Sequence, residues 1–89
     1  MIAREITIRG KVHGVFYRAS AKSKADEYSL LGWVKNVPDE SVVIWVEGAE
    51  PMVLQMIEWC WRGSDRARVK DVAVKVVELQ YYKEFEVIH

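Results

Sequence analysis

The alternation of apolar and polar residues between positions 3 and 12 constrains the fold more than any other feature of the sequence. Apolar side chains fall on one face of an extended strand and polar ones on the other: Ile6, Ile8 and Val12 against Glu5, Thr7, Arg9 and Lys11. A strand with one polar face belongs to a sheet that meets solvent on one side, as antiparallel sheets allow. The pattern therefore predicts a half-buried strand over residues 3–12.

Helical periodicity predicts two helices. The first is expected from Arg18 to about Leu30. Its sheet-facing residues recur at near-helical spacing and are Tyr17, Ala21, Ala25 and Tyr28. The second is expected to begin near Pro51, which suits a first helical turn, and to end at Gly63, which suits a left-handed C-cap. Its wide apolar stripe consists of Met52, Val53, Met56, Ile57, Cys60 and Trp61.

Further strands are expected over residues 33–36, 42–47, 68–79 and 85–88, with a turn at 37–40. The order is therefore β-α-β-β-α-β followed by a short extra C-terminal strand. This order predicts a single α+β domain over residues 1–89 with the ferredoxin-like fold, an antiparallel sheet with two helices on one face. We expect the first strand to be central and the strand that ends at Asn36 to lie beside it.

Charge and cysteine content narrow the class of protein. Thirteen basic and thirteen acidic side chains give a net charge of zero, which argues against a general binder of nucleic acid or membrane surfaces. One cysteine allows no disulfide within the chain, and one cysteine with two distant histidines makes no metal site. Charges near the N-terminus argue against a signal peptide. We expect a cytoplasmic monomer with no nucleic-acid or membrane partner.

The stretch from Gly10 to Arg18 connects the first strand to the first helix and carries the strongest functional signal. Backbone N–H groups in such a turn, together with a helix N-terminus, can form an anion site. Arg18 would add a planar fork of donors suited to phosphate. The stretch lacks the Lys-Ser/Thr ending of a nucleotide-binding P-loop. Taken alone, it could also be an ordinary turn, and Arg18 an ordinary solvated arginine.

Two motifs in this sequence resemble the signatures of the acylphosphatase family. The first motif is matched by Gly10, Val12, Gly14, Val15, Tyr17 and Arg18, with His13 where the family usually has Gln. The second is matched by Gly32, Trp33, Asn36, Val42 and Gly48, with Glu40 where the family has a turn glycine. The resemblance spans nearly the whole chain. Two signatures at the right separation are more specific than one glycine-rich loop.

The resemblance implies hydrolysis of small-molecule acyl phosphates to a carboxylate and inorganic phosphate, without a metal or another cofactor. Arg18 matches the family arginine that binds the phosphoryl group, and Asn36 matches the asparagine that positions the attacking water. The phosphate oxygens would be held by the backbone amides of Lys11, Val12, His13, Gly14, Val15, Phe16 and Tyr17. The alternative is a non-catalytic ferredoxin-like module that binds phosphate-containing ligands or RNA, although the first strand lacks the aromatic pair typical of RNA-recognition sheets.

Two departures from the family pattern leave alternatives open. His13 is either a pH-sensitive phosphate ligand or a tolerated loop residue whose backbone amide matters. Glu40 indicates either an altered turn or a residue with a strained positive φ. Asn36 could begin the turn with its side chain, a role compatible with catalysis.

Overall fold

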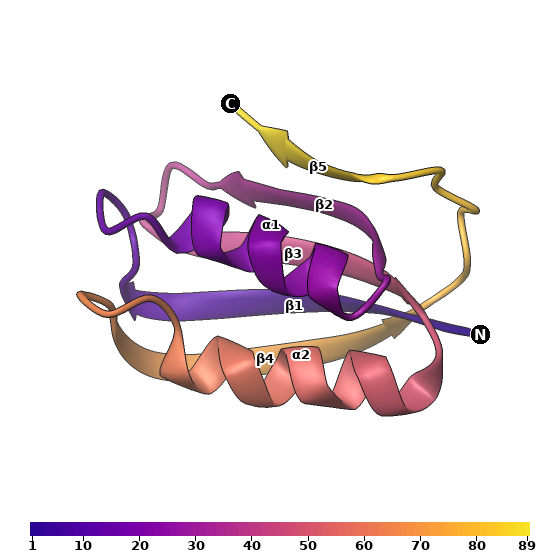
Figure 1. The fold of residues 1–89 in the computed structure, drawn as a ribbon. Helices are drawn as coiled ribbons and strands as arrows, with labels where there is room; N and C mark the ends of the chain where they lie inside the picture. The colour runs from indigo at the N-terminus through magenta and orange to yellow at the C-terminus, as the bar shows by residue number, and fades with distance from the viewer.

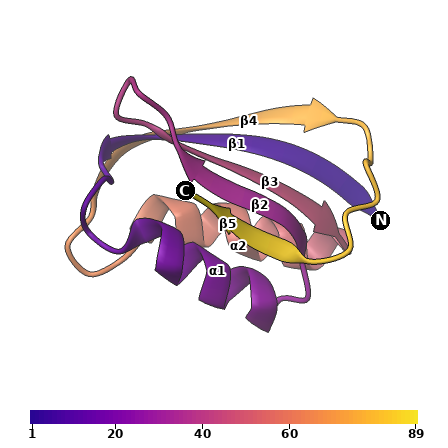
Figure 2. The same ribbon diagram turned by 90° about the horizontal axis from the view of Figure 1, so that it is seen from above.

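A computed structural model describes all 89 residues as one layer of five strands and one layer of two helices (Figure 1). The elements in chain order are β1 (Ile2–Lys11), α1 (Tyr17–Glu27), β2 (Leu31–Asn36), β3 (Val42–Gly48), α2 (Glu50–Arg62), β4 (Arg68–Val77) and β5 (Phe85–Ile88). Both helices cover the same face of the sheet (Figure 2). The predicted ferredoxin-like fold is confirmed.

The sheet has the strand order β4-β1-β3-β2-β5, so β3 is the central strand. The expectation that β2 lies beside β1 is wrong, because β3 pairs antiparallel with both and separates them. The sheet is also mixed rather than wholly antiparallel, since β5 runs parallel to β2 at the far edge. The chain leaves β4 at one edge and crosses to the other, so β5 enters the sheet in the direction of β2.

The core lies between the helices and the covered face of the sheet. Its sheet side is formed by the alternating apolar residues predicted for β1 and their partners on the neighbouring strands, including Ile6, Ile8, Val34, Val42, Ile44 and Val46. The small side chains of Ala21 and Ala25 let α1 lie close to the sheet. Val53, Met56 and Cys60 form the buried part of the apolar stripe of α2. Trp59 is buried next to Cys60, whereas Trp61 is exposed. Residues 59 and 61 point to different sides of the helix, so that both side chains cannot face the sheet.

The first helix is shorter than expected and ends at Glu27 rather than Leu30. Ser29 adopts a left-handed φ of 56°, which reverses the chain, and the Leu30 N–H donates to the Ala25 carbonyl at 2.8 Å. Neither helix has the length and apolar character required to cross a membrane.

A buried carboxylate near the end of β3 fixes the crossing segment 78–84. Glu47 is fully buried and accepts hydrogen bonds from the Gln80 N–H, from the Tyr82 N–H at 3.2 Å and from the Trp45 indole at 3.0 Å. Burial raises the pKa of this carboxyl, but the hydrogen bonds together lower it by more, so that it stays ionised. Glu47 therefore holds the segment that delivers β5 to the far edge of the sheet.

We expect Glu47→Gln to lower the free energy of unfolding by about 2 kcal/mol at pH 7, because the carboxylate charge and one of its two acceptor oxygens are lost to part-buried donors. A carboxyl with a lowered pKa stabilises the fold above its unfolded pKa and loses that effect as the pH falls. The difference between wild type and Glu47→Gln should therefore shrink below about pH 4.3. Urea denaturation at several pH values measures this, with exposed Glu58→Gln as the control. A constant difference down to pH 3 would contradict it.

Candidate active site

The loop between β1 and α1 turns on two left-handed residues. Gly14 has a φ of 68°, and Phe16, immediately before α1, has φ 61° and ψ 24°. The left-handed conformation costs a non-glycine residue about 1 kcal/mol, so that Phe16 is strained while Gly14 is not. No atom lies within 4 Å of the position that a Cβ on Gly14 would take. The backbone here faces open space that a ligand can approach.

This loop leaves a continuous set of backbone donors without a protein acceptor. The first backbone hydrogen bond of α1 runs from the Ser20 N–H to the Phe16 carbonyl, at 3.0 Å. None of the seven N–H groups of residues 13–19 donates to a backbone or side-chain acceptor. The first turn of α1 also carries no acidic side chain. Seven free donors at the positive end of a helix form a site for an anion, which we call the amide cradle.

Side chains behind the amide cradle hold its backbone in place. The Ser64 hydroxyl donates to the Val15 carbonyl at 2.7 Å and so ties the loop to the segment after α2. The buried Tyr17 hydroxyl donates to the Cys60 carbonyl at 2.8 Å, and its ring packs 5.2 Å from Trp59, centre to centre. Burial raises the pKa of Tyr17. Val15 and Tyr17 can therefore offer a ligand only their N–H groups, because their side chains are buried.

Gly63 makes room for this anchoring of Tyr17. A Cβ at Gly63 would lie 2.6 Å from Cε2 of the Tyr17 ring, and the residue has a φ of 67°. Any larger residue would push the aromatic ring and, with it, the first residue of α1. The predicted C-cap glycine of α2 thus also positions the amide cradle.

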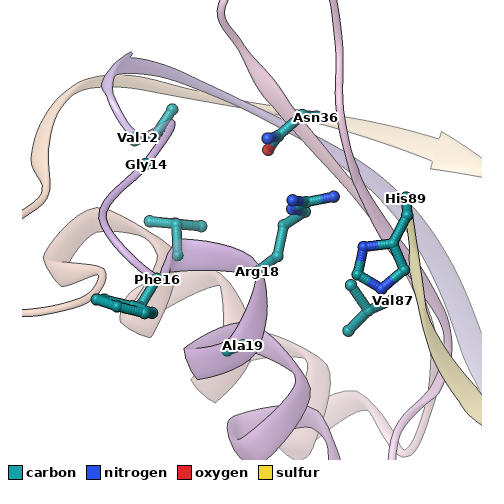
Figure 3. A pocket seen from close by; sticks show the side chains of 9 residues that line it. Val12, Gly14, Phe16, Arg18, Ala19, Asn36, Val87 and His89 are labelled. Carbon is teal, nitrogen blue, oxygen red and sulfur yellow. The ribbon is translucent and has the colours of Figure 1, made fainter.

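Arg18 and Asn36 face each other across a cavity of about 390 Å³ beside the cradle (Figure 3). Arg18 projects from the first turn of α1, and its Nη1 donates to the Ile88 carbonyl of β5 at 2.9 Å. Asn36 is the last residue of β2, and its buried Oδ1 has no hydrogen-bond partner. Asn36 itself lines the cavity, so that its amide group is placed to hold a bound water there.

The structure brings some of the predicted site residues together and places others outside the cavity. Those that line it are Val12, Gly14, Phe16, Tyr17, Arg18 and Asn36. Lys11 is exposed at the end of β1, away from the cavity. Ala19, Val87 and His89 also line the cavity and were missed. No local signal identifies Val87 or His89, because they reach the site only through the pairing of β5 with β2.

His13 links the amide cradle to the turn that follows Asn36. Its Nε2–H donates to the Ser41 carbonyl at 2.7 Å, so that the side chain is used in a structural contact. Asp39 accepts hydrogen bonds from the Ser41 hydroxyl, the Ser41 N–H at 3.0 Å and Arg9 at 3.2 Å. These hydrogen bonds lower the pKa of Asp39 to about 2, and the two from Ser41 contribute most. Glu40 has a φ of 73°, which agrees with the strained alternative at this position.

Comparison with known proteins agrees with this geometry. The family model named Acylphosphatase matches residues 4–87. Acylphosphatases of Marinobacter nauticus and Aeropyrum pernix are 44% and 45% identical to this chain, covering 94% and 93% of it and 92% and 80% of the relatives. The crystal structure of acylphosphatase from Bacillus subtilis superposes with a TM-score of 0.97 at 32% identity, covering 100% of both chains. The chain belongs to the acylphosphatase family.

We expect His13→Ala to weaken binding of inorganic phosphate about fivefold, because the cradle loses a tether worth roughly 1 kcal/mol. His13→Gln keeps an N–H donor at similar reach and should bind phosphate nearly as wild type does. Isothermal titration of phosphate into the three proteins measures the difference. Equal weakening in both variants would show that the imidazole acts by another route than the hydrogen bond to Ser41.

Proposed function

We propose that this protein hydrolyses acyl phosphates, with the phosphoryl group in the amide cradle and the attacking water beside Asn36. The water oxygen forms a new bond to phosphorus, and the bond between phosphorus and the acyl oxygen breaks. The products are a carboxylate and inorganic phosphate. The proposal is carried by one observation: Arg18, Asn36 and five of the seven residues with free N–H groups line one cavity.

The cradle and Arg18 supply the positive charge that phosphoryl transfer requires. In a loose transition state, negative charge spreads over the three equatorial phosphoryl oxygens. Fixed N–H donors and a guanidinium stabilise that charge without rearranging during the reaction. The hydrogen bond from Arg18 to Ile88 leaves the rest of the guanidinium fork free to contact phosphate oxygens. We therefore propose that no metal ion or other cofactor is needed.

Asn36 would orient the water rather than activate it. An amide cannot remove a proton, but its oxygen can accept a hydrogen bond and hold water in line with the bond that breaks. The water proton then passes to a phosphoryl oxygen of the substrate itself. No Asp, Glu or Cys side chain lines the cavity, and the one imidazole that does, that of His89, lies on the Arg18 side of it (Figure 3). A leaving carboxylate is stable as an anion and requires no general acid.

One chain supplies every residue of this mechanism, which supports a monomer as the active species. The substrate is a small-molecule acyl phosphate, and the zero net charge supports the absence of nucleic-acid and membrane partners. We propose a cytoplasmic enzyme. The buried Cys60 thiol, whose pKa burial raises to about 12, takes no part in the reaction.

We expect Arg18→Ala and Asn36→Ala each to lower kcat for benzoyl phosphate by at least about a hundredfold. This is the usual loss when a transition-state donor such as Arg18 is removed or when a reacting group such as the water at Asn36 is misplaced. Arg18→Ala should also raise KM, since it binds the ground-state phosphoryl group, whereas Asn36→Ala should leave KM nearly unchanged. Steady-state kinetics measures both.

The matched controls are Lys22→Ala, one turn further along α1, and Lys35→Ala, adjacent to Asn36. Both should retain wild-type kinetics. Wild-type turnover by Asn36→Ala would contradict the role given to this residue.

A further inference from the structure

A second, larger hollow lies behind the amide cradle, between α1 and the loop that follows α2. It measures about 910 Å³. The loops before α1 and after α2 lie at the same end of the molecule in both views (Figures 1 and 2), and the Ser64 bond to Val15 joins them. We call this hollow the basic groove, because its lining includes Lys24, Arg62, Arg66 and Arg68 against a single carboxylate, Asp65.

The arginines of the basic groove have no acidic partner in the fold. Arg62, Arg66 and Arg68 are exposed, and none of them takes part in an ion pair. Arg68 donates to the carbonyl of its neighbour Ala67 at 3.2 Å, and Lys24 lies 3.5 Å from Glu27. The groove thus gathers unpaired positive charge on a protein whose net charge is zero. Such a concentration attracts an anion.

The wall of the groove nearest the cradle is apolar. Its exposed part is the Phe16 ring, because the neighbouring Val15 and Trp59 are buried, and Phe16 borders both the basic groove and the cavity that holds Arg18 and Asn36. Phe16 has a strained φ and is 77% exposed. A ligand that runs from the cradle over the Phe16 ring would meet an apolar surface first and cationic side chains beyond it.

In-line displacement fixes where the acyl group of a substrate must lie. The attacking water and the leaving oxygen are on opposite sides of phosphorus. With the water at Asn36, the acyl group leaves on the side of the cavity away from Asn36. Asn36 and Phe16 lie on opposite sides of the site (Figure 3). The acyl group therefore extends past Phe16 towards the basic groove.

From this arrangement we infer that the preferred substrates are acyl phosphates whose acyl group carries a second anionic group, such as a carboxylate. This inference rests on the proposed function and names its substrate class. The hydrocarbon part of the acyl group packs on Phe16, and the distal carboxylate lies among Arg62, Arg66 and Arg68. Guanidinium groups pair with carboxylates through two parallel hydrogen bonds.

The test compares two substrates of nearly equal shape, 4-carboxybenzoyl phosphate and 4-methylbenzoyl phosphate. For wild type we expect kcat/KM to be about fivefold higher with the carboxylate, the upper range for a solvent-exposed ion pair. Arg62→Ala/Arg66→Ala should bring the ratio to about one and leave kcat/KM for the methyl substrate unchanged. Arg66→Ala alone should give an intermediate ratio.

Lys70→Ala/Lys75→Ala is the matched control, because it removes the same net charge from exposed positions on β4. It should keep the fivefold ratio. An equal loss in this control would overturn the inference in favour of general electrostatic attraction, as would a wild-type ratio of one. Failure to hydrolyse either substrate would refute the proposed function itself.

A second experiment, inhibition by sulfate, distinguishes binding of a substrate carboxylate in the basic groove from binding of a free anion there. Sulfate should inhibit hydrolysis of the methyl substrate by occupying the amide cradle, with the same inhibition constant in wild type and Arg62→Ala/Arg66→Ala. An inhibition constant raised in the double variant would place free anions in the basic groove and overturn the assignment to substrate.

Discussion

The seven unpaired N–H groups of residues 13–19 are the feature on which the site depends. A chain that passed from β1 into α1 through an ordinary capped turn would satisfy several of these donors internally. With left-handed conformations at Gly14 and Phe16, all seven lack a protein acceptor instead. The backbone is strained at Phe16, and α1 begins without a side-chain cap. Both features leave N–H groups free for an anion.

The surrounding fold keeps this strained loop in one conformation. His13 ties one end to the β2–β3 turn, Ser64 holds the middle through the Val15 carbonyl, and Tyr17 anchors the other end in the core. Arg18 donates to Ile88, which reaches the site through the pairing of β5 with β2, and Glu47 holds the segment before β5 at the opposite end of β3. Contacts remote from the chemistry thus set the position of the arginine.

Periodicity was sufficient for the order of the elements, because that order depends on short-range patterns. Arg18 and Asn36 were predicted from the resemblance to the acylphosphatase signatures, and the structure places both at one cavity. The expected adjacency of β1 and β2 was wrong, yet both strands are antiparallel to β3 and therefore parallel to each other. Their C-terminal residues therefore lie at the same end of the sheet, where Asn36 and the amide cradle are found. The placement of Ile88 and His89 at the site and the contacts of Glu47 could not be predicted, since they depend on long-range pairing and on burial that no local pattern encodes.

The central claim is that backbone amides of residues 13–19 bind the phosphoryl group. Titration of ¹⁵N-labelled protein with inorganic phosphate, followed by amide chemical shifts, tests it most directly. The account predicts that the largest saturable shifts fall on these seven amides and on the Arg18 side chain. Shifts concentrated instead around residues 66–70, with the amides of residues 13–19 unmoved, would contradict it.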